Sequence, residues 1–185
     1  MKRVESRLPG LVVVDPVVHG DERGFFLESF REDALRELGI DEHWVQDNHA
    51  RSGRGVLRGM HFALPPGQAK LVRCVRGHVV DVVVDIRRNS PTYGQWEAID
   101  LDDVTGRMVY VPVGFAHGYC VVSEIADVAY KCSGYYDPAL EREISVNDPD
   151  VGIQWPDVEI LLSARDQAAP NLRDVADGLP FTFTA

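Results

Sequence analysis

The fold is decided by one stretch of the chain, Gly106-Arg-Met-Val-Tyr-Val-Pro112-Val-Gly114-Phe-Ala-His117. Its β-branched and aromatic residues predict a strand over Arg107 to Val111. A Pro-x-Gly-x-x-His turn follows, and proline and glycine are the residues that favour such a chain reversal. The stretch therefore predicts a turn that delivers the imidazole of His117 at the start of a further strand, Gly118 to Val122.

Strand signals also dominate the rest of the chain, where Gly- and Pro-containing turns separate short apolar runs. Many short strands at regular spacing are typical of an all-β sandwich or jelly roll. The one convincing helix is Arg31 to Leu38, which Gly39 stops in a C′ position. The further predicted strands are Leu11 to Val14, Gly24 to Phe30, Val56 to Phe62, Ala69 to Val75, His78 to Ile86, Trp96 to Leu101 and Asp127 to Cys132. We expect the first two to flank a turn at His19-Gly-Asp-Glu.

Length and composition bound the class of protein. The 185 residues fit one domain over residues 1–185, and a net charge of −10 argues against a nucleic-acid or anionic-membrane surface. Three widely spaced cysteines are expected to be small core residues in a reducing compartment, and no window reaches transmembrane length. The N-terminus lacks the apolar stretch of a signal peptide, so we expect a cytoplasmic protein. The segment after Pro138 is expected to pack along the barrel through Ile153, Trp155, Ile160 and Leu161.

The period of two along a strand predicts which side chains point inward. Lys70 shares a face with the apolar Val72, and Tyr130 shares a face with Val128. A buried lysine and a buried tyrosine each need a partner or a task. We therefore expect both side chains to face an internal cavity.

Arg58 and His61 differ in parity, so on a regular strand they would face opposite ways. Gly59 lies between them, and a glycine inside a strand often marks a β-bulge. A bulge there would turn both side chains toward one cavity.

The Pro-x-Gly-x-x-His turn resembles the second half of the cupin signature, whose histidine points into a jelly-roll barrel. The first half is incomplete: Gly55 and His61 have the expected separation, but Ala63 replaces a second histidine and Gln68 stands about where a glutamate would be. Divalent metals usually need three or four protein ligands, and only the imidazoles of His61 and His117 remain. We expect a cupin-type jelly roll with no metal.

A series of longer motifs follows in order along nearly the whole chain. They are Arg23-Gly-Phe-Phe-Leu-Glu28, Gln46-Asp-Asn48, Gly55-Val-Leu-Arg58-Gly-Met-His61-Phe, Gln68-Ala-Lys70, Asp81-Val-Val-Val-Asp85-Ile-Arg87, Gly94-Gln-Trp, Pro112-Val-Gly-Phe-Ala-His117-Gly, Tyr130-Lys-Cys, Tyr135-Tyr136, Asn147-Asp-Pro-Asp and Leu162-Ser-Ala-Arg165-Asp166. Together they resemble the dTDP-4-dehydrorhamnose 3,5-epimerase family of the cupin superfamily. The resemblance implies an enzyme without a cofactor that inverts the carbons flanking the ketone of a dTDP-linked 4-keto-6-deoxy sugar. One departure is Ala63, where many members carry Gln.

The same resemblance implies four catalytic roles. The carbon acid beside the ketone is weaker than imidazolium by roughly 13 pKa units, or about 18 kcal/mol, so the enolate must be stabilised. His61 is the expected base and Asp166 its partner. Tyr130 is the expected acid on the opposite face of the sugar, and Lys70 the cation near the ketone oxygen.

Substrate-binding roles are implied as well. Arg23 is expected at the diphosphate, Phe26 at the thymine ring and Glu28 at the base edge. Family members form homodimers that exchange N-terminal strands, so Arg23 would serve the neighbouring subunit's site. The further expected binding residues are Gln46, Asn48, Arg58, His117, Tyr136 and Arg165.

Other interpretations remain open at this stage. Alone, Tyr130 would be a core tyrosine, Phe26 a core residue and Asp166 a solvated carboxylate. An epimerase that inverts only carbon 3 or carbon 5 of a related sugar in secondary metabolism is one alternative, and a non-catalytic sugar-nucleotide-binding cupin is another. A metal-dependent cupin is disfavoured by Ala63 and Gln68.

Overall fold

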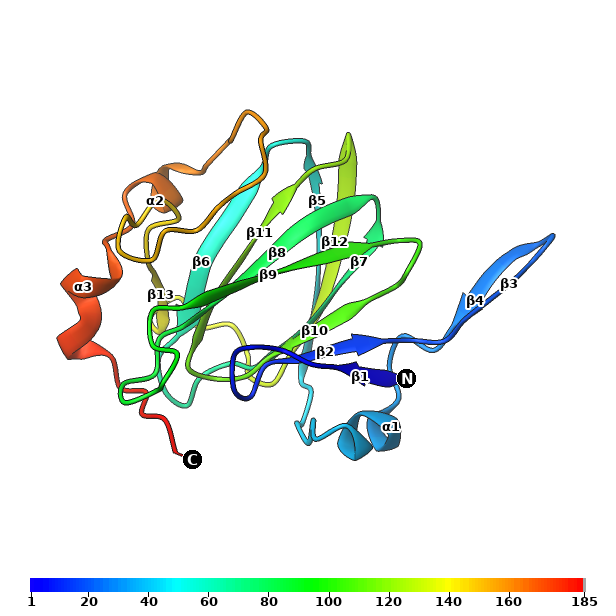
Figure 1. Ribbon diagram of the computed structural model, residues 1–185, viewed down its shortest axis with the longest axis horizontal. Helices are drawn as coiled ribbons and strands as arrows, with labels where there is room; N and C mark the ends of the chain where they lie inside the picture. The colour runs from blue at the N-terminus through cyan, green and yellow to red at the C-terminus, as the bar shows by residue number, and fades with distance from the viewer. Residues whose placement is uncertain (185) are drawn as a thin grey trace.

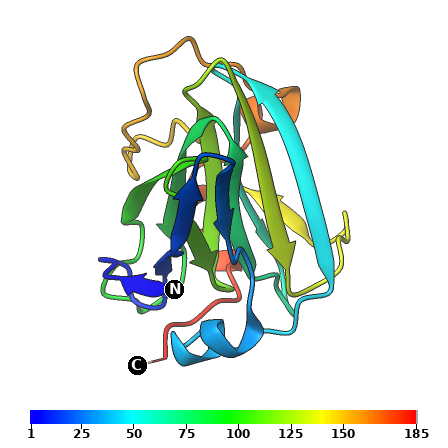
Figure 2. The same cartoon turned by 90° about the vertical axis from the view of Figure 1, so that its right-hand side faces the viewer.

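Two antiparallel sheets face each other in the computed structural model, which describes residues 1–184 (Figure 1). The larger sheet has the order β1 (Lys2–Val4), β2 (Val12–Asp15), β10 (Met108–Val111), β7 (Lys70–Arg76), β12 (Ile125–Cys132) and β5 (Gln46–Gly53). The smaller sheet has the order β13 (Glu141–Glu143), β6 (Leu57–Ala63), β11 (Phe115–Val121), β8 (His78–Asp85) and β9 (Trp96–Asp102). The view along the sheets shows them as the two walls of a barrel (Figure 2).

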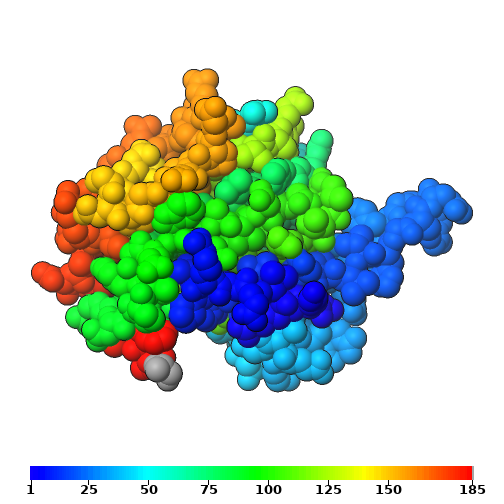
Figure 3. Space-filling model, in the orientation of Figure 1, coloured from blue at the N-terminus to red at the C-terminus, as the bar shows by residue number. Residues whose placement is uncertain are grey.

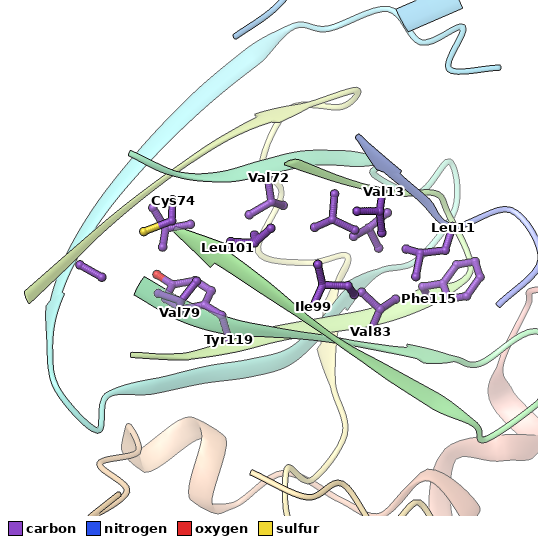
Figure 4. Close-up of a cluster of buried hydrophobic side chains, with 14 of the residues drawn as sticks. Leu11, Val13, Val72, Cys74, Val79, Val83, Ile99, Leu101, Phe115 and Tyr119 are labelled. Atoms are coloured by element: carbon purple, nitrogen blue, oxygen red, sulfur yellow. The ribbon is translucent and has the colours of Figure 1, made fainter. Parts of the chain in front are cut away.

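An apolar layer fills the space between the two sheets (Figure 4). Val72 of β7 and Val109 of β10 meet Val83 of β8 and Leu101 of β9, and all four are fully buried. Full burial of such a side chain contributes roughly 1.5–3 kcal/mol. The layer therefore fixes the two sheets against each other, and the polar side chains of the cavity are held by a rigid frame.

The predicted all-β jelly roll is confirmed, and the ends of the predicted strands coincide with the observed ends or differ by at most three residues. The stretch from Gly106 to His117 forms β10 and the first part of β11. His117 therefore lies inside β11, whereas it was expected just before a strand that begins at Gly118. The sequence did not indicate β5, whose polar residues Gln-Asp-Asn-His-Ala-Arg-Ser-Gly have low strand propensity. This strand pairs along its whole length with β12 at the edge of the larger sheet.

The N-terminal region differs most from the prediction. Strands β3 (Val18–Asp21) and β4 (Gly24–Leu27) pair only with each other and form an arm that projects from the barrel (Figures 1 and 3). The turn expected at His19-Gly-Asp-Glu is displaced, because His19 to Asp21 belong to β3 and the chain reverses at Glu22–Arg23. The reversal joins β3 to β4, whereas β2 pairs with β1 and β10. The side chains of Phe25 and Phe26 on the arm are 64% and 67% exposed.

The predicted helix is present as α1 (Glu32–Glu37), one residue shorter at each end, and Gly39 follows it with φ +87°. Short helices in the tail were not predicted: α2 (Ala164–Gln167), α3 (Leu172–Val175) and η1 (Ala176–Gly178). Across residues 1–184, none of the helices has the length and apolar character needed to span a bilayer.

Of the expected tail anchors, Ile153, Trp155 and Ile160 pack against the outer core of the smaller sheet. Leu161 was wrong as an anchor, since it is 53% exposed and its backbone instead bridges Val56.

Candidate active site

A cavity of about 500 Å³ brings together Lys70 and Tyr130, which the period of two placed inside the barrel, and the further expected residues Arg58, His61 and His117. Arg58 and His61 reach it from β6, Lys70 from β7, His117 from β11 and Tyr130 from β12. Both sheets therefore contribute side chains, and the packed layer between the sheets sets their spacing.

A bulge in β6 turns Arg58 and His61 toward the same cavity. In the pairing of β6 with β11, His61 lies opposite His117 and Arg58 lies opposite Tyr119. Three positions of β6 therefore span two positions of β11, and the register shifts between the two pairs. Gly59 lies at the shift with φ +148°, and a Cβ added there would come within 2.7 Å of the Gly118 backbone. The bulge is thus present as expected, and it requires glycine at position 59.

The imidazole of His61 is bound by a carboxylate from the tail. His61 Nε2 lies 2.7 Å from Asp166 Oδ1, and the Asp166 side chain is only 5% exposed. Ser163 caps the short helix α2 by accepting a hydrogen bond from the Asp166 backbone N–H at 3.1 Å. The cap fixes the carboxylate toward the ring, so Nε2 donates to Asp166 and Nδ1 keeps its lone pair.

The surroundings favour the neutral form of this imidazole. Burial lowers the pKa of His61, and the nearby positive charges of Lys70 and Arg165 lower it further, while Asp166 opposes the shift. A neutral ring near pH 7 can accept a proton, and the carboxylate stabilises the imidazolium that results.

Lys70 is a further cation that lines the cavity beside His61. Burial lowers the pKa of its ammonium group, and the carboxylate of Glu141 is the strongest influence in the opposite direction. Glu141 lies on β13 and pairs with Ala63 of β6. Glu141 does not line the cavity, but its charge acts on Lys70. The sequence analysis did not single it out, because a three-residue strand leaves no periodic signal.

The second histidine of the cupin-like motif is also bound to a carboxylate. His117 Nε2 lies 2.8 Å from Asp81 Oδ2, and burial raises the pKa of the fully buried Asp81. Within residues 1–184, no three or more His, Cys, Asp or Glu side chains are grouped so that they could hold a metal ion.

Tyr130 faces the cavity from the larger sheet, where burial raises the pKa of its hydroxyl. Opposite Tyr130 in the β5–β12 register is Asn48, which accepts a hydrogen bond from Gln46 Nε2 at 3.1 Å. Gln46 Oε1 in turn accepts from the backbone N–H of Tyr136 at 2.9 Å. These three residues therefore form one polar group beside the cavity, and the Tyr136 side chain is exposed.

Two arginines complete the cavity lining. Arg58 Nε donates to Ser52 Oγ at 3.1 Å, and Arg165 is paired with Glu143 of β13. Both guanidinium groups lie on the cavity wall, where they can meet an anionic ligand.

Three expected binding residues lie on or beside the projecting arm and do not line this cavity. Arg23 pairs with Asp21 at the exposed tip. Phe26 is exposed, and Glu28 Oε1 lies 3.8 Å from Arg31 Nη1. Within one subunit, the sequence-predicted site residues are therefore divided between the cavity, the polar group of Gln46, Asn48 and Tyr136 outside its lining, and the arm, whose projection from the barrel Figure 3 shows.

The fold and the cavity define the class: a cupin-type jelly roll with an internal acid–base site. Residues 5–174 match the family model described as dTDP-4-dehydrorhamnose 3,5-epimerase. The chain is 46% identical over 172 residues to the dTDP-4-dehydrorhamnose 3,5-epimerase of Salmonella typhimurium, covering 91% of this chain and 94% of the relative. The chain belongs to the dTDP-4-dehydrorhamnose 3,5-epimerase family.

Two further relatives bear on the reaction. A dTDP-4-dehydrorhamnose 3-epimerase of Streptomyces niveus is 46% identical over 172 residues, covering 92% of this chain and 83% of the relative. A solved dTDP-6-deoxy-D-glucose-3,5-epimerase of Legionella pneumophila, in complex with dTDP-4-keto-L-rhamnose, superposes with a TM-score of 0.95 at 43% identity. That match covers 100% of this chain and 99% of the Legionella chain.

Proposed function

We propose that the protein is an isomerase that inverts carbons 3 and 5 of dTDP-4-dehydro-6-deoxyglucose and gives dTDP-4-dehydro-L-rhamnose or a related deoxysugar. The observation that carries the proposal is the His61–Asp166 pair, which shares one cavity with Lys70 and Tyr130. A base, a cation and a hydroxyl around one space are the groups that proton transfer beside a ketone requires.

In the proposed reaction, His61 removes the proton from the carbon beside the ketone. Because the environment lowers the pKa of His61, the ring is an even weaker base than free imidazole and cannot form the enolate unaided. Lys70 stabilises the negative oxygen, and the buried setting strengthens this interaction. Tyr130 then delivers a proton to the opposite face of the carbon, which inverts its configuration. Each step uses only side chains of the chain and no cofactor.

The guanidinium groups of Arg58 and Arg165, together with His117, are proposed to hold the diphosphate and the sugar. Gln46, Asn48 and Tyr136 form the polar group beside the cavity and are proposed to contact the nucleotide.

We further propose a homodimer in which the arm crosses to the partner subunit, so that Arg23, Phe26 and Glu28 complete the partner's site. The exposed phenyl rings of Phe25 and Phe26 support this arrangement, because large apolar side chains at a strand tip gain from burial in an interface. A nucleotide-linked sugar as substrate also favours the cytoplasm as the site of action.

The direct test is incubation of the protein with dTDP-4-keto-6-deoxyglucose in deuterated water. The proposed function predicts deuterium at carbons 3 and 5 together with the L-configured product, both followed by NMR. His61→Ala serves as the matched control, because it removes the base and little packing. A protein that binds the nucleotide sugar without any deuterium uptake would instead be the non-catalytic binding module.

A single-position epimerase is the second candidate, and the 46% identity to the Streptomyces niveus 3-epimerase favours considering it. The same experiment separates the two candidates. Deuterium at carbon 3 alone would assign the narrower reaction, whereas deuterium at both carbons assigns the double inversion.

A further inference from the structure

Tyr119 lies on the cavity wall but has no role in the proposed mechanism. It belongs to β11, two residues after His117, and both side chains therefore point to the inside of the barrel. Its ring packs in the apolar layer at the end that holds Cys74 and Val79 (Figure 4). The ring is thus held rigidly, and the question is what its hydroxyl does.

The Tyr119 hydroxyl is one of two buried side-chain oxygens or nitrogens that make no hydrogen bond to any of residues 1–184. The other is Asp81 Oδ1, which belongs to a carboxylate already bound to His117 through its second oxygen. Ser52 is near Tyr119 and slightly lowers the pKa of its hydroxyl, but Ser52 Oγ accepts a hydrogen bond from Arg58 Nε at 3.1 Å, and no hydrogen bond joins the hydroxyls of Ser52 and Tyr119. A buried hydroxyl without a partner is unfavourable, so the residue calls for a functional explanation.

The surroundings of the hydroxyl are those of the reaction site. Arg58 lies directly opposite Tyr119 in the β6–β11 register, and Asp81 lies opposite it in β8. Burial raises the pKa of Tyr119 to about 12, with Arg58 opposing and Tyr130 adding to the shift. The hydroxyl therefore keeps its proton at neutral pH and can act as a donor.

We propose that the Tyr119 hydroxyl donates a hydrogen bond to an oxygen of the sugar in the bound sugar nucleotide. This inference rests on the proposed function for the nature of the ligand. The hydroxyl is buried in the free protein, on the wall of the cavity that Arg58 also lines. The sugar oxygen then supplies the acceptor that the protein itself does not, so Tyr119 is a specificity-determining residue of the sugar subsite.

Tyr119→Phe tests the proposal, because it deletes the hydroxyl and keeps the ring. We expect kcat/KM to fall roughly three- to tenfold, the range for one neutral hydrogen bond. The affinity for dTDP-quinovose, which has a hydroxyl in place of the ketone, should fall by a similar factor in calorimetric titration. The affinity for dTDP alone should not change, and the Tm should stay the same or rise.

Tyr110→Phe is the matched control. Tyr110 is also buried, but its hydroxyl donates to Glu42 Oε1 at 2.7 Å, outside the cavity. Its removal should lower the Tm and leave kcat/KM and both affinities unchanged. The two variants together separate a hydroxyl that serves the ligand from one that serves the fold.

The proposal is overturned if Tyr119→Phe lowers the Tm and leaves kcat/KM unchanged, since the hydroxyl would then be structural. It is equally overturned if dTDP loses as much affinity as dTDP-quinovose, which would place the contact on the nucleotide. Absence of epimerisation by the native protein would count against the proposed function alone. The titrations with dTDP and dTDP-quinovose would still decide the role of Tyr119.

Discussion

His61 and Asp166 lie 105 positions apart in the chain, yet their side chains meet at 2.7 Å inside the barrel. The histidine comes from a rigid strand of the smaller sheet, whereas the aspartate comes from a four-residue helix in the tail. The tail forms part of the cavity wall, to which Leu162, Ser163 and Arg165 contribute together with Asp166. The base therefore depends on the docking of the tail, and the following predictions use this dependence.

His61→Ala should reduce epimerisation by about 10²- to 10⁴-fold, the usual contribution of a positioned general base. Asp166→Asn should give a smaller loss of roughly ten- to a hundredfold, because it weakens one charge-assisted hydrogen bond and keeps the shape. Steady-state assays with dTDP-4-keto-6-deoxyglucose measure both effects.

Asp100→Asn is the matched control for these variants. Asp100 Oδ1 lies 2.7 Å from His78 Nε2 in another His–carboxylate pair, which is exposed and does not line the cavity. Its replacement should leave activity within about twofold, since exposed pairs contribute little. Appreciable deuterium exchange by His61→Ala would show that another residue is the base.

The pH profile of kcat/KM should report the titration of His61. The base must be neutral, and the pKa of His61 is lowered from the ordinary value of 6.5, so the acid limb should have its midpoint below pH 6.5. Asp166→Asn removes the main influence that raises this pKa, and the acid limb should therefore move to still lower pH while the plateau falls. A limb that stays in place in Asp166→Asn would assign the titration to a different group.

Much of this architecture could be predicted from the sequence, for reasons that particular residues make clear. Lys70 and Tyr130 were placed inside the barrel because side-chain alternation is strict in a strand. Gly59 predicted the bulge because a glycine inside a strand often marks one, and the structure shows that a Cβ has no space there. By contrast, β5 was missed because its pairing with β12 depends on tertiary packing that overrides the low strand propensity of its residues.

Tertiary pairing also determines residues near the site that the sequence could not indicate. The position of Glu141 depends on the pairing of β13 with β6, and nothing local in the sequence records that pairing. The arm residues Arg23 and Phe26 were expected at the substrate, but within one subunit they lie outside the cavity. Contacts between distant segments, or between subunits, leave no periodic pattern along a single chain.

Gly59→Ala should lower the free energy of unfolding by about 1–3 kcal/mol, because an L side chain is strained at φ +148°. The added Cβ would also lie 2.7 Å from Gly118 Cα and 3.2 Å from the His117 carbonyl oxygen, so β6 must shift and carry His61 with it. Urea unfolding should show the loss of stability, and activity should fall at temperatures where the variant is still folded. Gly178→Ala is the control, since its Cβ would have no neighbour within 4 Å, and both readouts should stay near the native values.

If the arms are exchanged between subunits, an Arg23→Ala subunit and a His61→Ala subunit should together form one intact site. Arg23→Ala should lower kcat/KM by roughly ten- to a hundredfold through the loss of a charged contact, and His61→Ala should be nearly inactive. In a heterodimer of the two, one site combines both defects and the other has an intact His61 together with the intact arm of its partner. Heterodimers purified with two different affinity tags should therefore regain about half of the native activity. If each arm served its own subunit, no intact site would form and activity would remain at the parental level.

Tyr130→Phe should separate proton removal from inversion. His61 and Lys70 remain in place and can still form the enolate, whereas the proton on the opposite face has lost its donor. In deuterated water, deuterium should still enter the substrate at carbons 3 or 5 through return from the His61 side or from solvent. The yield of inverted product should fall much further than the uptake of deuterium, by about 10²-fold or more if Tyr130 is a general acid. NMR of the recovered sugar measures both quantities in one sample, and an equal loss of the two would mean that Tyr130 positions the substrate and that the acid is a different residue.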